Sequence, residues 1–132
     1  MNLGGTSLTH YFQGRVTVSL DLYFHATRKV EVGQFNYTHN LGQMASQVQW
    51  GPEKTDTLYM LLWRPEELQI TQAGGMIIAL EESIRILESD PVFYKTFNPP
   101  NKWGDYDTFL GFCKEVLKCC KENPDAEVEA SR

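Results

Sequence analysis

The sequence predicts an α+β domain in which a small antiparallel sheet is covered on one face by three to four helices. Three observations lead to this prediction. Two neighbouring segments near the start alternate apolar and polar residues, the middle and end carry apolar residues at helical spacing, and one more short alternating segment follows. The chain has 132 residues, of which 42% are hydrophobic, which is enough for one domain with its own core.

We expect residues 15–132 to form this domain and residues 1–14 to be a flexible N-terminal segment. Residues 11–14 read Y-F-Q-G, like the end of a protease-cleavage tag, so residues 1–14 are left out of the site prediction.

The first two alternating segments predict an antiparallel β-hairpin. Residues 29–37 form the second strand, and Gly33 interrupts its alternation, which indicates a bulge. Residues 25–28 are the connection between the strands. Residues 15–24 form the first strand, whose apolar face holds Val16, Val18, Leu20, Leu22 and Phe24.

Residues 40–49 are expected to be a helix. Leu41, Met44 and Val48 follow helical spacing, and Asn40 is a favoured residue at a helix N-cap. Free N–H groups at the start of this helix make an anion site possible there, but a plain N-cap is the favoured explanation of Asn40.

The stretch after this helix is less regular. The sequence W-G-P at 50–52 ends the helical pattern, and the polar residues 53–57 are expected to be a loop. Residues 58–63 read L-Y-M-L-L-W, which fits either a short helix or a buried strand.

Residues 64–67 begin a helical segment, because Pro65 suits the first helical position. Residues 73–89 give the clearest helix, in which Gly74 and Gly75 either fray the start or allow a close backbone approach. Its apolar stripe consists of Ala73, Met76, Ile77, Leu80, Ile84 and Leu87.

The last third predicts two helices and a strand. Asp90 caps a short helix over 91–97, and Asp105 caps a long helix over 106–122. Residues 126–130 alternate and are expected to pair with the hairpin. A sheet this small leaves an edge that invites pairing between subunits, so a homodimer is expected.

Composition excludes several classes of function. The net charge is −5 with no basic cluster, which argues against general nucleic-acid binding. No signal peptide or membrane-length apolar run is visible. Cys113, Cys119 and Cys120 match neither a disulfide framework nor zinc-ligand spacing, so reduced thiols, a cytoplasmic location and no cofactor are expected.

Polar and aromatic side chains gather at the predicted element ends, where binding residues often lie. Trp63 and Arg64 suggest a clamp for an aromatic, phosphate-bearing ligand, and Asn101, Trp103 and Tyr106 suggest a pocket wall. Packing in the core explains the same aromatic residues without a ligand. The predicted ligand-binding residues are Thr38, His39, Asn40, Trp63, Arg64, Asn101, Trp103 and Tyr106.

Four short motifs resemble those of a group of small bacterial and phage proteins to which no activity is assigned. They are T-H-N-L-G-Q-M-A, L-W-R-P-E-E, N-P-P-N-K-W-G-D-Y and C-K-E-N-P-D-A-E-V-E-A-S-R, and they fall within residues 36–132. The resemblance implies a microbial, phage-encoded or bacterial, cytoplasmic protein, and it transfers no catalytic residue.

The sequence favours a non-enzymatic protein that binds a small polar or nucleotide-like ligand, because no nucleophile motif or metal-ligand set accompanies the polar residues. One alternative is a small hydrolase in which His39 acts as a base with a carboxylate such as Asp105. Another is a protein-interaction module that uses the sheet edge or exposed aromatic residues.

Overall fold

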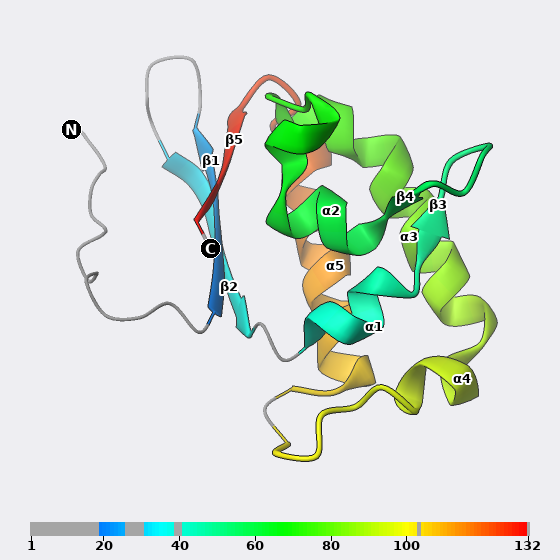
Figure 1. The fold of residues 1–132 in the computed structure, drawn as a ribbon. Coiled ribbons are helices and arrows are strands. Elements are labelled where there is room, and N and C mark those ends of the chain that lie inside the picture. Colours follow the sequence, from blue (N-terminus) through cyan, green and yellow to red (C-terminus); the bar gives the residue numbers. More distant parts are fainter. Residues whose placement is uncertain (1–18, 26–30, 39–40, 103, 132) are drawn as a thin grey trace.

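The computed structural model describes residues 19–25, 31–38, 41–102 and 104–131. It confirms the α+β class. A three-stranded antiparallel sheet has the order β2-β1-β5, and the helices gather on one side of it (Figure 1). Helix α5 contacts strand β2 and helix α2 contacts strand β5, so the sheet is covered across its width.

Strands β1 (Ser19–His25) and β2 (Glu31–Thr38) form the predicted hairpin. Every second residue of β1 is fully buried, as the alternation predicts: Leu20, Leu22 and Phe24. The register slips between Phe24 and His25, whose partners are Gly33 and Glu31, so the expected bulge lies beside Gly33.

Strand β5 (Glu127–Ser131) pairs with β1 on the side opposite β2. This confirms that the last strand joins the hairpin and makes β1 the central strand. Strand β2 is an edge strand of the described sheet. The homodimer that such an edge suggests stays a prediction.

Helix α1 (Gly42–Ser46) is shorter than the predicted 40–49 helix. Leu41, rather than Asn40, holds the N-cap position and makes no side-chain cap hydrogen bond. A five-residue helix also has too weak a dipole to support the suggested anion site. Asn40 itself lies outside the described residues.

Residues 53–55 are irregular, as expected for the loop over 53–57. This loop joins a short two-stranded pair, β3 (Gln49–Trp50) and β4 (Asp56–Thr57), so its last two residues belong to a strand. Gly51 makes the turn possible with a φ of 90°, a left-handed conformation that favours glycine. Two-residue strands are too short for alternation to show in the sequence, which explains why this pair was not predicted.

Helix α2 (Leu58–Trp63) settles the open choice for 58–63 in favour of a helix. The Thr57 side chain caps it by accepting a hydrogen bond from the Met60 N–H at 3.2 Å. The 3-10 helix η4 (Pro65–Leu68) follows directly and begins with proline, as expected.

The predicted 73–89 helix is divided into a 3-10 helix η5 (Ala73–Met76) and helix α3 (Ile77–Ser89). Gly74 allows a close backbone approach, because a Cβ atom there would lie 3.1 Å from the Pro124 carbonyl oxygen. The Gly74 N–H donates to that same oxygen at 2.8 Å. The first turn of the predicted helix is therefore shaped by the chain after α5.

Helix α4 (Pro91–Lys95) begins at the predicted cap, where Asp90 accepts from the Phe93 N–H at 3.2 Å. Tyr94 faces the core, whereas Val92 and Phe93 are exposed. Helix α5 (Tyr106–Glu122) has the predicted bounds. Within the described ranges, no helix combines the length and the apolar content that a membrane span requires.

A capping box fixes the start of α5. The Asp105 carboxylate accepts from the Thr108 N–H at 2.8 Å, and the Asp105 N–H donates to the Thr108 hydroxyl at 3.1 Å. The hydrogen bond from the Thr108 backbone lowers the pKa of Asp105 below its ordinary value.

This lowered pKa predicts a pH dependence of stability. The stabilisation by ionised Asp105 is complete above its unfolded-state pKa and is lost as the pH falls through the lower folded-state pKa. Asp105→Asn keeps a cap but cannot titrate, so its melting temperature should fall below that of the wild type near neutrality and converge with it in acid. Asp107→Asn is the matched control for charge. A gap that stays constant down to low pH would contradict the prediction.

Candidate functional site

Part of the predicted ligand site falls outside the part of the chain that the structure describes. His39, Asn40 and Trp103 lie outside the described residues. The backbone of Thr38 ends strand β2 opposite Ser19. The Thr38–Asn40 cluster and the hydrolase that relies on His39 therefore stay predictions.

Trp63 is a core residue. Its side chain is fully buried and its ring stacks on Tyr59, one helical turn earlier in α2, with centroids 5.1 Å apart. Because neither face of the ring is open to solvent, Trp63 offers no surface on which a ligand could stack. The predicted clamp therefore lacks its apolar half in this arrangement.

Arg64 is partly exposed and already engaged. Its Nη1 lies 2.9 Å from the Glu67 carboxylate in an i,i+3 ion pair. Hydrogen bonds to Glu67 and then to Tyr59 raise the pKa of the guanidinium above its ordinary value. Arg64 thus ties the end of α2 to η4 and is not aimed at an open site.

Tyr106 is also a packing residue. Its hydroxyl donates to the Leu87 carbonyl oxygen at 2.6 Å, and its N–H donates to the Asn98 side chain at 2.8 Å. Burial raises the pKa of the Tyr106 phenol. Asn101 is exposed in the same loop, at the N-terminal end of α5.

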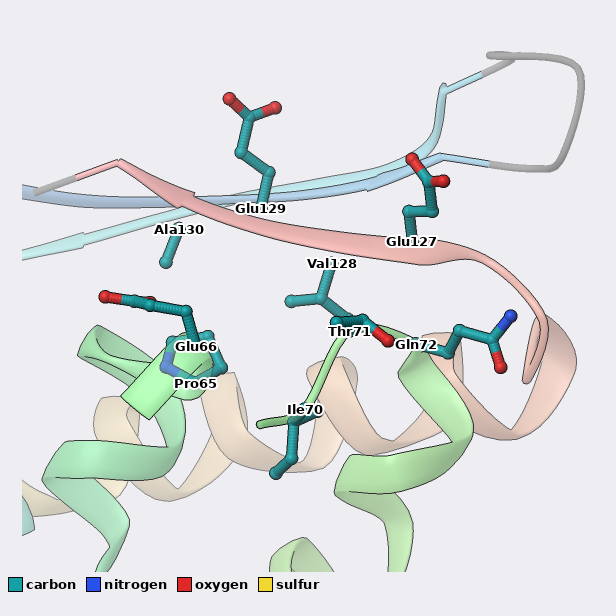
Figure 2. Close-up of a pocket in the computed structure, with 9 residues that line it drawn as sticks. All are labelled: Pro65, Glu66, Ile70, Thr71, Gln72, Glu127, Val128, Glu129 and Ala130. Carbon is teal, nitrogen blue, oxygen red and sulfur yellow. The ribbon is translucent and has the colours of Figure 1, made fainter. Parts of the chain in front are cut away.

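A cavity of about 470 Å³ lies elsewhere, between strand β5 and the segment after α2. We call it the β5 groove (Figure 2). The groove lies near the C-terminal end of α5. Ala73, the residue after the groove-lining Gln72, donates its N–H at 2.8 Å to the carbonyl of Ala126, which follows α5 in the chain. Helix α5 has 17 residues and is about 25 Å long, so the loop holding Asn101 lies far away. The groove is lined by Pro65, Glu66, Ile70, Thr71, Gln72, Glu127, Val128, Glu129 and Ala130.

The groove has an apolar floor and an acidic rim. Val128 and Ala130 point from β5 toward Pro65 and Ile70, whereas Glu127 and Glu129 point away from the helices (Figure 2). Glu66 stands beside Pro65 on the opposite wall. The described residues that line the groove include three glutamates and no lysine, arginine or histidine.

Backbone groups of β5 face the same groove. The Val128 N–H donates to the Thr71 carbonyl at 2.9 Å, which shows that Val128 points its backbone groups outward, away from β1. Because backbone direction alternates along a strand, Ala130 points its N–H and C=O outward as well. Within the described ranges, no segment pairs with β5 beyond Val128 on this side.

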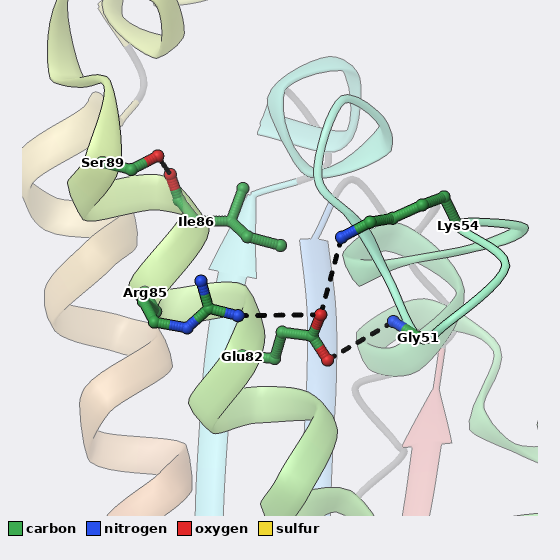
Figure 3. Close-up of polar contacts among 6 residues, drawn as sticks. All are labelled: Gly51, Lys54, Glu82, Arg85, Ile86 and Ser89. Carbon is green, nitrogen blue, oxygen red and sulfur yellow. Dashed lines mark hydrogen bonds and ion pairs between the residues drawn. The ribbon is translucent and has the colours of Figure 1, made fainter.

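A second polar cluster centres on Glu82 of α3 and serves the fold (Figure 3). Its carboxylate accepts from the Gly51 N–H at 3.4 Å and lies 3.7 Å from both Lys54 and Arg85. These contacts hold the turn between β3 and β4 against α3. Every charge in the cluster has a partner, which indicates a structural role.

The groups most often used for metal and thiol chemistry are arranged as follows in the described part of the chain. It contains no group of three or more His, Cys, Asp or Glu side chains placed to hold a metal ion. All three cysteines are buried, and burial raises the pKa of Cys113 and brings that of Cys120 to about 12. These thiols are therefore protonated near neutrality and poor nucleophiles.

The sequence prediction missed the β5 groove for a definable reason. It sought polar side chains at element ends, whereas the groove is built from backbone edges and small apolar side chains. The alternation of glutamate with Val128 and Ala130 was the one available signal, since it marks a strand with an acidic face.

Comparison of the chain with protein-family models, curated proteins and solved structures finds no match. The resemblance to small bacterial and phage proteins thus stays an expectation, and no residue role is transferred from another protein.

Proposed function

We propose that this chain is a non-catalytic interaction module that binds an extended peptide segment by strand addition at β5. The single observation behind the proposal is the outward-facing backbone of Ala130 beside an open cavity. Strand addition takes its affinity from main-chain hydrogen bonds and its specificity from pockets for alternate side chains. The β5 wall of the groove offers both outward-facing backbone groups and an apolar surface for alternate side chains.

The first part of the β5 edge is already paired within the chain. Residues 71–73 already run antiparallel to β5, with hydrogen bonds from Ala73 to Ala126 and from Val128 to Thr71. The chain then leaves the edge, because Ile70 packs toward the core and η4 lies beyond it. A peptide entering the groove would continue the pairing past Thr71.

Replacing Ala130 with proline tests this proposal. Proline removes the outward-facing N–H of Ala130 and leaves the ladder to β1 intact, which is the position where an edge strand tolerates proline. Peptides of about ten residues, selected on the wild type from a random displayed library, would be titrated by fluorescence anisotropy. We expect at least about tenfold weaker binding to Ala130→Pro, equal to the loss of about 1.4 kcal/mol.

Ala130→Val is the matched control, because it changes the side chain but keeps the N–H. Circular dichroism and urea unfolding would establish that both variants fold. Equal binding of the selected peptides to the wild type and both variants would show that the peptides bind at another site, and it would reject strand addition at β5. N-methylation of single peptide residues should weaken binding only at every second position, where the peptide N–H would face β5.

Binding of a small polar ligand is the second candidate function. The volume of the β5 groove falls within the range of about 300–1,000 Å³ that is typical of small-molecule sites. Its acidic rim would repel phosphate, so a nucleotide-like ligand fits this cavity poorly. A thermal-shift screen across nucleotides tests the nucleotide-like ligand, and the absence of any shift would reject it.

A further inference from the structure

We infer that the segment bound in the β5 groove alternates apolar and basic residues. This inference rests on the proposed strand addition and adds the chemical class of the partner. Two observations carry it: the apolar floor and the acidic rim lie on opposite faces of the same strand.

The first observation fixes the periodicity of the partner. A peptide strand beside β5 also alternates its side chains between the two faces of the sheet. Side chains on one face would meet the floor, where Val128, Ala130 and Ile70 are partly buried and pack against the core. Small apolar side chains at every second position bury the most apolar surface there.

The second observation fixes the charge. Directly opposed residues on one face of an antiparallel pair have Cβ atoms about 5 Å apart, and opposite charges at such positions stabilise pairing. Glu127 and Glu129 are exposed on the outer face of β5. Glu127 already lies opposite Gln72 of the chain itself, so Glu129 is the carboxylate beside the open part of the edge. His25 lies 3.4 Å from Glu129 on the β1 side, so the side facing the open edge is left for a basic partner.

The overall charge acts in the same direction. The chain has a net charge of −5, and the described lining of the groove adds no cation to offset its three glutamates. A negative cleft raises the local concentration of cationic partners and speeds their association, an effect that salt weakens. An acidic peptide would instead place a like charge opposite Glu129.

The experiment uses three synthetic peptides of about ten residues that alternate valine with lysine, glutamine or glutamate, each carrying a fluorophore. We expect the lysine peptide to bind tightest and the glutamate peptide weakest. Glu129→Gln should weaken lysine-peptide binding by up to about fivefold at low salt, as for one exposed ion pair of up to about 1 kcal/mol. Glu115→Gln removes the same charge elsewhere and should leave binding unchanged.

The outcomes separate this inference from the function on which it rests. Equal binding of all three peptides, with loss at Ala130→Pro, would overturn the charge inference and keep strand addition. Binding of the lysine peptide that survives Ala130→Pro would reject strand addition itself. A lysine peptide whose affinity is the same for Glu129→Gln and Glu115→Gln would show non-specific attraction to an acidic protein and overturn the inference.

Discussion

Replacing Trp63 with alanine is expected to lower the free energy of unfolding by about 3–5 kcal/mol, the usual cost of deleting a buried large aromatic side chain. The ring is fully buried and stacks on Tyr59, so its removal loses both hydrophobic burial and an aromatic pair. Domains of this kind are stable by only about 5–15 kcal/mol, so the loss is large. Urea unfolding followed by circular dichroism measures it.

Two further variants keep this prediction testable. Trp63→Leu leaves a smaller cavity and should lie between the wild type and Trp63→Ala if the alanine variant fails to fold. Ile78→Ala removes a side chain that is 78% exposed and should change stability by less than about 0.5 kcal/mol. A Trp63→Ala protein as stable as the wild type would show that Trp63 is not a core residue, which would revive its role as a ligand clamp.

Replacing Tyr106 with phenylalanine is expected to cost about 1–3 kcal/mol, although only one oxygen atom is removed. The Tyr106 hydroxyl donates to the Leu87 carbonyl near the end of α3. In a continuing helix, the N–H of the residue four positions later would donate to the Leu87 carbonyl. That residue is Pro91, which has no backbone N–H. The substitution therefore leaves a buried carbonyl without a partner.

Tyr94→Phe is the matched control. Tyr94 is equally buried, but in the described part of the structure its hydroxyl makes no hydrogen bond, so the change should be small. Thermal unfolding of both variants gives the comparison. Equal destabilisation by the two substitutions would contradict the role assigned to the Leu87 contact.

Local signals in the sequence predicted much of the fold. The alternation in residues 19–25 gave the buried face of β1, and Asp105 marked the start of α5 because its cap involves only neighbouring residues. The bulge beside Gly33 was predicted for the same reason.

Features that depend on distant partners were not predictable. The β3–β4 pair is held by Glu82 of helix α3. The first turn of the predicted 73–89 helix is shaped by the close approach of Gly74 to Pro124. Trp63 and Tyr106 looked like ligand residues because a sequence shows chemical type but not burial. The β5 groove was missed because it requires two segments about sixty positions apart to meet along a strand edge.

The central position of β1 has a consequence for biosynthesis. Leu22 in β1 pairs with Ala130 in β5, so the sheet closes only after all the intervening helices have been made. While the ribosome has yet to release β5, the edge of β1 stays open and able to pair wrongly with another nascent chain. We expect this stage, more than the finished protein, to require the protection of a chaperone.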